Sequence, residues 1–133
     1  MGTPVSGQYD AVVVGAGPAG SATAALLARR GFSVLLLDRA AFPRDKACGE
    51  YTSPETEQVL KRIGVLEPVL RAGARRLPAM KVISPSGCSF TMQYSRECHS
   101  DEAHVIATPR RILDATLVDH ARRCGVCVQE REK

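Results

Sequence analysis

A glycine-rich turn between an apolar strand and a helix constrains the fold of this 133-residue chain more than any other feature. Residues 11–14 form a short valine-rich run, which is typical of a buried parallel strand. Gly15, Gly17 and Gly20 follow with the spacing G-x-G-x-x-G. The first glycine permits a tight turn, the second lets another group approach the backbone, and the third lets the following helix pack closely on the sheet. The pattern predicts a Rossmann-like βαβ fold of the α/β class.

A helix and a second strand complete this βαβ unit. Pro18 suits the first helical turn, where its missing N–H costs nothing, and Ala19 follows it. The helix is predicted to run to about Arg30, and residues 34–37 form a second buried strand that ends at Asp38. The free amides of the helix start attract phosphate, and a carboxylate at the end of the second strand suits a ribose hydroxyl. The unit therefore predicts dinucleotide binding, and the alternative is a glycine-rich turn that binds nothing.

The rest of the chain is predicted to contain more helices and strands than one βαβ unit. The expected elements are a loop at 42–50, helices at 54–63 and 66–71, strands at 79–85 and 88–94, an exposed polar stretch at 95–103, a strand at 105–107, a helix at 108–123 and a strand at 126–129. Thr52 or Ser53 is expected to cap the first of these helices, and Gly64 to end it. On the 108–123 helix, one broad side is expected to carry Ile112, Leu113, Thr116, Leu117 and His120.

Composition and charge exclude several classes of partner. The net charge is +4, but the arginines are scattered, often as pairs, and aromatic residues make up only 5%. A nucleic-acid surface concentrates positive charge and stacking residues on one face, so no nucleic-acid partner is predicted. Five cysteines without a secretory leader favour a reducing cytoplasm. Nothing in the sequence supports peripheral membrane association.

The cysteines and histidines predict no metal site. Cys124 and Cys127 form a C-x-x-C, but one ends a predicted helix, the other lies in a predicted strand, and no second C-x-x-C accompanies them. Cys98 and His99 with His104 supply too few ligands. No Ser–His–Asp arrangement has local support, so hydrolase chemistry is not expected. No residue can be assigned as a catalytic acid or base.

Two sets of residues resemble known flavoproteins. Pro18-Ala19, Gly31, Val34 and the pair Asp38-Arg39 accompany the glycines as in the FAD-binding fingerprint of flavoprotein oxidoreductases. The segments FPRDKACGE, SPETEQVLKRIGV, MKVISPSGCSFTMQY and PRRILDATLVDHARRCGV resemble the geranylgeranyl reductase-like branch of the group that includes aromatic hydroxylases and flavin-dependent halogenases. This resemblance spans nearly the whole chain.

The resemblance implies which residues bind the cofactor FAD. Asp38 would bind the adenosine ribose, Arg39 and Arg44 would lie along the ADP half, and Arg110 would contact the ribityl–phosphate chain. Cys48 is either a packing residue or a thiol that lines the site. The implied cofactor-binding residues are Gly15, Gly17, Pro18, Ala19, Gly20, Asp38, Arg39, Arg44, Cys48, Gly49 and Arg110.

The same resemblance implies a domain organisation. Members of the group run well beyond 133 residues, so the chain resembles the N-terminal part of an FAD-binding domain. Its nucleotide-binding core would comprise about 8–75 and 104–130, and a hairpin at about 78–96 would belong to a substrate domain. Cys48 and Gly49 would lie near the flavin end. The following residue, Glu50, stands where many reductases have a second glycine, which weakens a specific assignment to prenyl reduction.

The expected function is that of a flavin-dependent oxidoreductase of the reductase or monooxygenase type. This chain would be its FAD-binding portion and would bind the ADP half of FAD. NAD(P)H is the candidate electron donor, and the substrate is expected to be a small apolar or aromatic molecule. Two alternatives remain: an NAD(P)-dependent dehydrogenase, and a truncated nucleotide-binding module without catalysis. The isolated 133-residue chain is expected to be inactive.

Overall fold

The computed structural model describes residues 8–94 and 104–132. The chain divides into two compact units, one made of Met1–Ala47 with Arg110–Lys133 and the other of Cys48–Pro109. The first unit is therefore built from two stretches of sequence, and the second lies between them along the chain. Within the described residues, no helix has both the length and the apolar character needed to cross a membrane.

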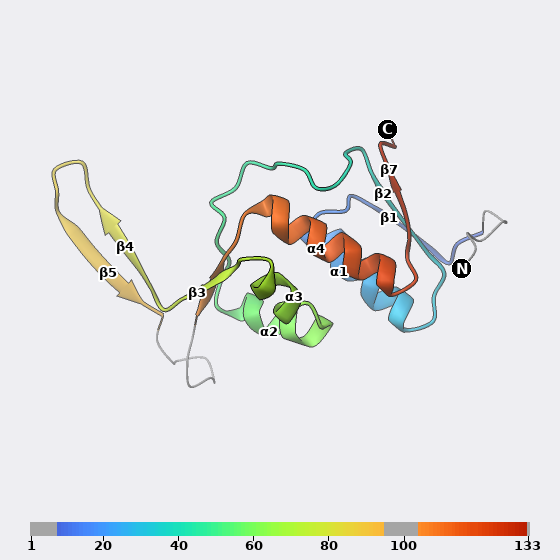
Figure 1. The fold of residues 1–133 in the computed structure, drawn as a ribbon, viewed down its shortest axis with the longest axis horizontal. Coiled ribbons are helices and arrows are strands. Elements are labelled where there is room, and N and C mark those ends of the chain that lie inside the picture. Colours follow the sequence, from blue (N-terminus) through green and yellow to red (C-terminus); the bar gives the residue numbers. More distant parts are fainter. Residues whose placement is uncertain (1–7, 95–103, 133) are drawn as a thin grey trace. The chain divides into compact units, whose positions relative to one another are not determined.

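A parallel sheet with two helices forms the first unit (Figure 1). Its elements are β1 (Ala11–Val14), α1 (Pro18–Arg29), β2 (Val34–Asp38), α4 (Arg110–Arg123) and β7 (Cys127–Glu130). The strand order is β1-β2-β7, and Val13, Leu36 and Val128 lie in register across the three strands. The predicted parallel βαβ arrangement is confirmed.

Small side chains let α1 and α4 lie side by side in this unit (Figure 1). Ala24 and Ala25 of α1 and Ala121 of α4 are buried, and they share one apolar cluster with Val34 and Leu36 of β2. Because alanine adds little bulk, the two helices can approach each other and the sheet closely. This close contact brings the first residue of α4 into the same unit as the turn before α1.

The buried side of α4 includes a charged residue that the prediction did not name. Leu113 and Leu117 are buried as expected, but Asp114 is completely buried as well. His120 is only partly buried. The prediction did not name Asp114, whose charge is compensated inside the fold by two arginines, which are described below.

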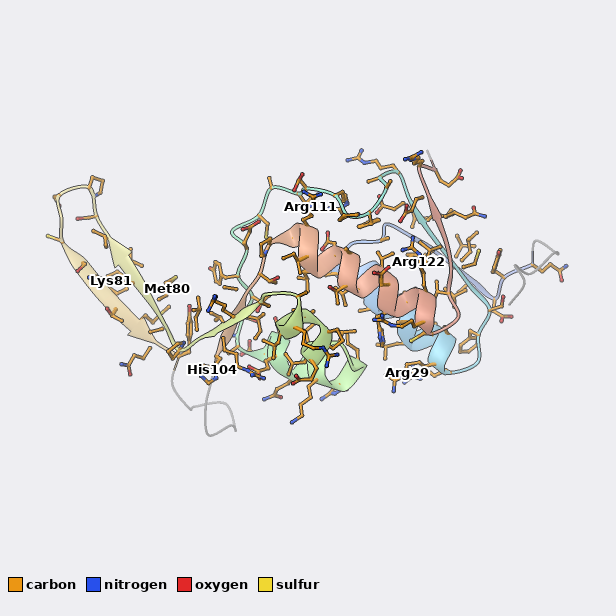
Figure 2. The ribbon with its side chains drawn as sticks, in the orientation of Figure 1. Arg29, Met80, Lys81, His104, Arg111 and Arg122 are labelled. Atoms are coloured by element: carbon orange, nitrogen blue, oxygen red, sulfur yellow. The ribbon has the colours of Figure 1, made fainter. Side chains whose placement is uncertain are left out.

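Arg122 links the end of α4 to β7, and Figure 2 labels its side chain. Its guanidinium lies 2.7 Å from Glu130 Oε1 and 3.0 Å from Asp119 Oδ1. Burial alone would lower the pKa of Arg122, but the hydrogen bonds to Glu130 and Asp119 outweigh it and raise that pKa. These contacts hold the last strand to the helix that precedes it.

The described residues of the second unit, 48–94 and 104–109, form two helices and two small antiparallel sheets. Its elements are α2 (Glu55–Ile63), α3 (Leu66–Arg71), β3 (Arg75–Leu77), β4 (Ala79–Ile83), β5 (Ser89–Gln93) and β6 (Val105–Ala107). β3 pairs with β6, and β4 pairs with β5. Leu60, Ile63, Val69 and Ile106 are buried in this unit. The strand β3 was not predicted.

The start of α2 also differs from the prediction. Pro54 occupies the N-cap position, and no side chain caps the helix. The hydroxyl of Ser53 instead lies 3.3 Å from that of Thr56, so the predicted cap by Thr52 or Ser53 is wrong. The predicted end at Gly64 is confirmed, because this glycine adopts the left-handed conformation with φ +85°.

The hairpin of β4 and β5 has one apolar face. Met80 pairs with Met92, and Val82 pairs with Phe90, so these four side chains project to the same side. Lys81 alternates with them and projects to the other side; Figure 2 labels Met80 and Lys81 on this strand. Phe90 is 61% exposed, so the apolar face of the hairpin is open to solvent in this chain.

Candidate functional site

The turn between β1 and α1 is shaped by its glycines. Gly15 has φ +98°, a conformation that other residues rarely adopt, and its N–H donates to the carbonyl of Leu37 at 2.7 Å. A Cβ on Gly20 would lie 1.8 Å from the carbonyl oxygen of Gly15, so no larger residue fits there without movement. The buried Ser21 hydroxyl donates to the carbonyl of Ala16 at 3.0 Å and braces the turn. The first and third glycines thus do what the spacing predicts.

Asp38 joins the end of β2 to this turn. Its Oδ2 accepts a hydrogen bond from the N–H of Ala16 at 2.7 Å, and its Oδ1 accepts one from the N–H of Ala40 at 2.8 Å. Each carboxylate oxygen has a second acceptor position, so a further donor can still bind. Sequence reasoning assigned Asp38 to a ligand alone and missed its contact with the backbone of the turn. Arg39, the next residue, is exposed.

Three charged side chains gather beside the turn. Asp114 accepts two hydrogen bonds from Arg110, from Nε to Oδ1 and from Nη2 to Oδ2, each 2.9 Å long. Arg44 pairs with the same carboxylate, because its Nη1 lies 3.0 Å from Asp114 Oδ2. This Nη1 is buried and has no hydrogen bond of good geometry. The guanidinium of Arg44 also lies 5.0 Å from the ring centre of Phe42, within the range of a cation–π contact.

Both arginines point toward Gly17. A Cβ at this position would lie 3.9 Å from Nη2 of Arg44 and 3.9 Å from Nη2 of Arg110. Gly17 is the N-cap of α1, where backbone amides lack helical partners, and Pro18 and Ala19 form the first turn. The structure therefore brings together Gly17, the helix start and two arginines that the sequence predicted separately. An anion is the chemical species that such a place favours.

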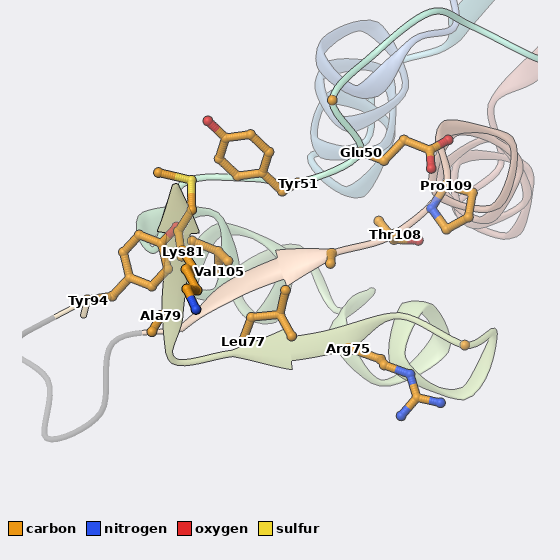
Figure 3. Close-up of a pocket in the computed structure, with 14 residues that line it drawn as sticks. Glu50, Tyr51, Arg75, Leu77, Ala79, Lys81, Tyr94, Val105, Thr108 and Pro109 are labelled. Atoms are coloured by element: carbon orange, nitrogen blue, oxygen red, sulfur yellow. The ribbon is translucent and has the colours of Figure 1, made fainter. Parts of the chain in front are cut away.

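The remaining predicted residues, Cys48 and Gly49, fall in the second unit, where both are exposed. Gly49 lines a cavity of about 650 Å³, shown in Figure 3. The apolar part of its lining includes Tyr51, Leu77, Tyr94 and Val105, and its charged part includes Glu50 and Lys81. Thr108 also lines it, and the buried hydroxyl of this threonine has no hydrogen-bond partner. The sequence did not predict this cavity, because its lining comes from short segments without a shared motif.

The cysteines of the C-x-x-C have separate neighbours. Cys124 Sγ lies 3.4 Å from Nε2 of His120, one helical turn earlier in α4. Cys127 instead contacts Tyr9, and this hydrogen bond to the thiol raises the pKa of the Tyr9 hydroxyl. Cys98 and His99 lie outside the described residues. Across residues 8–94 and 104–132, no three His, Cys, Asp or Glu side chains are grouped to hold a metal ion.

Comparison with known families identifies the chain. Residues 8–133 match the family model whose description is FAD binding domain. The chain belongs to this FAD-binding family. The match covers the glycine turn, Asp38 and both arginines beside Gly17, and the family's cofactor is the one that the resemblance implied.

Proteins with different activities resemble this chain. Digeranylgeranylglycerophospholipid reductase 1 of Methanococcoides burtonii is 34% identical over 127 residues, which are 95% of this chain and 29% of that protein. Menaquinone reductase of Mycolicibacterium smegmatis is 57% identical over 58 residues, 44% of this chain and 14% of that protein. The structure of the myxobacterial chondrochloren halogenase CndH, an FAD-dependent halogenase, superposes with a TM-score of 0.79 at 31% identity, covering 92% of this chain and 28% of the halogenase.

The chain thus spans less than a third of each of these relatives. The likeness to the halogenase, which covers both units, confirms the α/β fold of FAD-dependent enzymes for this chain. The relatives include reductases and a halogenase. Membership of the family therefore identifies the cofactor as FAD but does not identify the reaction.

Proposed function

We propose that this chain is the part of a flavin-dependent oxidoreductase that binds the ADP half of FAD. The observation that carries the proposal is the convergence of Arg44 and Arg110 on Gly17, each with Nη2 3.9 Å from the place of a Cβ. A phosphate carries negative charge and accepts several hydrogen bonds, and two guanidinium groups with a helix start match both properties. The absence of a side chain on Gly17 leaves room for the phosphate to approach the backbone.

Each predicted residue has a task in this proposal. Gly15 and Gly20 hold the turn, and Pro18 and Ala19 start the helix whose amides face the pyrophosphate. Asp38 accepts a hydrogen bond from the adenosine ribose with the acceptor positions that the backbone leaves open. Arg39 and Arg44 lie along the ADP half, and Arg110 contacts the ribityl–phosphate chain.

The second unit has its own proposed tasks. Cys48 and Gly49 lie toward the flavin end of the cofactor, and the hairpin at about 78–96 belongs to a substrate domain. The nucleotide-binding core comprises about 8–75 and 104–130. The exposed apolar face that carries Val82 and Phe90 supports the assignment of the hairpin, because a two-stranded sheet with an open apolar face needs a further layer against it.

FAD, when bound, supplies the redox chemistry, and the protein supplies binding and orientation. The reaction is that of a reductase or monooxygenase on a small apolar or aromatic substrate, with NAD(P)H as the electron donor. Both named reductases among the relatives act, by their names, on molecules with long apolar chains, and this supports the apolar class. We place the protein in the cytoplasm.

The proposal is tested by titrating the chain with FAD and, separately, with NAD, following flavin fluorescence and calorimetric heat. We expect FAD to bind with at most micromolar affinity, about −8 kcal/mol, and NAD to bind more weakly. Tighter binding of NAD would refute the assignment to FAD and favour the dehydrogenase alternative. We expect no turnover from the chain by itself; substrate-dependent oxidation of NAD(P)H by a preparation that keeps FAD through gel filtration would contradict this part.

A further inference from the structure

The completely buried carboxylate of Asp114 is explained neither by the sequence pattern nor by the family match. Removing a charge from water costs several kcal/mol unless partners compensate it. Here the partners are Arg110, bound through two hydrogen bonds of 2.9 Å, and Arg44, whose Nη1 lies 3.0 Å from Oδ2. Arg110 begins α4, whereas Arg44 belongs to the loop after β2. One carboxylate therefore joins two elements that are far apart in sequence.

The charges of this cluster do not cancel. Two guanidinium groups and one carboxylate have a net charge of +1. The two arginines would repel each other without Asp114, since both place Nη2 beside Gly17. With Asp114 between them they stay together, and the cluster as a whole keeps a positive charge beside Gly17. The buried Nη1 of Arg44 also has no hydrogen-bond partner of good geometry.

We infer that Asp114 is a positioning residue that holds Arg44 and Arg110 as a preformed pair for a diphosphate group at Gly17. This inference rests on the proposed function for the identity of the whole ligand, but its own content is the pairing of the two arginines. Asp114 does not touch the ligand. It fixes two side chains with many rotamers before the ligand arrives, so that binding the ligand does not cost their conformational entropy.

The test substitutes Asp114→Asn, which keeps the size of the side chain. With the amide N–H₂ at the place of Oδ2, it meets Arg44 Nη1 and Arg110 Nη2 donor to donor, and only the bond from Arg110 Nε to the amide oxygen remains, so the two arginines are no longer held together. We expect the affinity for ADP, measured by calorimetry, to fall at least about ten-fold, the smallest loss expected for a charge-assisted hydrogen bond. Binding of adenosine, which has no phosphate, should not change. Equal loss for ADP and adenosine would mean general damage to the fold and would overturn the inference.

Asp119→Asn is the matched control. Asp119 lies on the same helix and pairs with Arg122 at 3.0 Å, but its side chain is 60% exposed. We expect this variant to bind ADP as the unchanged chain does. Loss of ADP affinity in both variants would show that any change of charge on α4 weakens binding, and the inference would fail.

A second measurement separates this inference from the proposed function. The Nε–H resonances of Arg44 and Arg110 are followed by NMR while inorganic pyrophosphate is added. We expect both resonances to shift in the unchanged chain and neither to shift in Asp114→Asn. If FAD does not bind but this pattern appears, the proposed function fails and the inference stands. If FAD binds equally to both proteins, or pyrophosphate shifts neither resonance in the unchanged chain, the inference is overturned.

The variant Arg44→Lys covers the case in which Asp114→Asn does not fold. Lysine keeps the charge in the loop, but its single ammonium cannot contact Asp114 and a phosphate with separate nitrogens. We expect a loss of ADP affinity of at least about ten-fold. Unchanged affinity would show that charge alone is sufficient and would overturn the pairing.

Discussion

Replacing the third glycine of the turn by alanine should destabilise the fold, although alanine is the better helix former. Gly20 lies inside α1, where helix propensity alone would make Gly20→Ala stabilising by about 1 kcal/mol. The new Cβ, however, would lie 1.8 Å from the carbonyl oxygen of Gly15, 3.0 Å from its carbonyl carbon and 3.4 Å from Cγ1 of Val13. The steric overlap is therefore with the backbone, which cannot rotate away as a flexible side chain can.

The clash should outweigh the propensity. Inserting a methyl group into a packed site costs about 1–3 kcal/mol, and contact with backbone puts Gly20→Ala at the upper end. Relaxation of the turn is restricted, because Gly15 is held at φ +98° and its N–H is bonded to Leu37. Subtracting about 1 kcal/mol for propensity leaves a net loss of about 2 kcal/mol in the free energy of unfolding. Urea unfolding followed by circular dichroism measures this difference.

Gly17→Ala is the matched control in the same turn. Its Cβ would meet no atom closer than 3.9 Å, so the free energy of unfolding should change by less than about 0.5 kcal/mol, as for an ordinary surface substitution. The methyl group would nevertheless occupy the space proposed for the phosphate, so FAD affinity should fall. A Gly20→Ala variant that unfolds at the same or a higher urea concentration than the unchanged chain would refute the steric argument.

Three further outcomes are expected. Asp38→Ala should weaken FAD binding by about 1.5–3 kcal/mol, the scale for a charged hydrogen bond, while FMN, which lacks the adenosine, binds almost as before; calorimetry giving equal losses would count against the ribose contact. Replacing Cys124 and Cys127 together by serine should leave FAD affinity unchanged and the purified protein without stoichiometric zinc; zinc detected by mass spectrometry and lost on substitution would contradict this. Hydrogen bonds from its own backbone N–H and the Ser53 hydroxyl lower the pKa of Glu55 from its ordinary value of 4.5, so the ionised carboxylate adds to the free energy of unfolding above that pH, and this contribution is lost as the pH falls through the lowered pKa. Glu55→Gln should therefore lower the free energy of unfolding at pH 7 but not in acid; a difference in urea unfolding that does not depend on pH would refute the assignment.

Most elements of the fold could be predicted from local sequence patterns. The valine run, the glycine spacing and the second apolar strand predict β1, α1 and β2, because each depends on a few neighbouring residues. The strand β3 could not be found in this way. Arg75 and Arg76 have no apolar alternation, and all three residues of the strand are exposed, so only pairing with the distant β6 makes them a strand.

The sequence predicted most residues of the candidate site one at a time, but not the contacts between them. The glycines and Asp38 follow from spacing, whereas Arg110 was connected to the site only by family resemblance. The role of Asp114 was missed because a carboxylate on a helix is ordinarily exposed. One signal was available: Arg110 and Asp114 are four residues apart, which places them on the same side of a helix. The third partner, Arg44, depends on tertiary structure and has no trace in local sequence.

The division of the first unit into two stretches of sequence has a consequence for its synthesis. The strand β2 ends at Asp38, and its partner β7 begins only at Cys127. During translation, β1, α1 and β2 are therefore synthesised long before Val118 and Ala121, which belong to the same apolar cluster. Closing so long a loop slows folding, and until then the apolar side of β2 remains open to other chains. The residues that are translated first are thus among the last to be fully buried, and rapid completion of the chain would shorten the interval in which they are exposed.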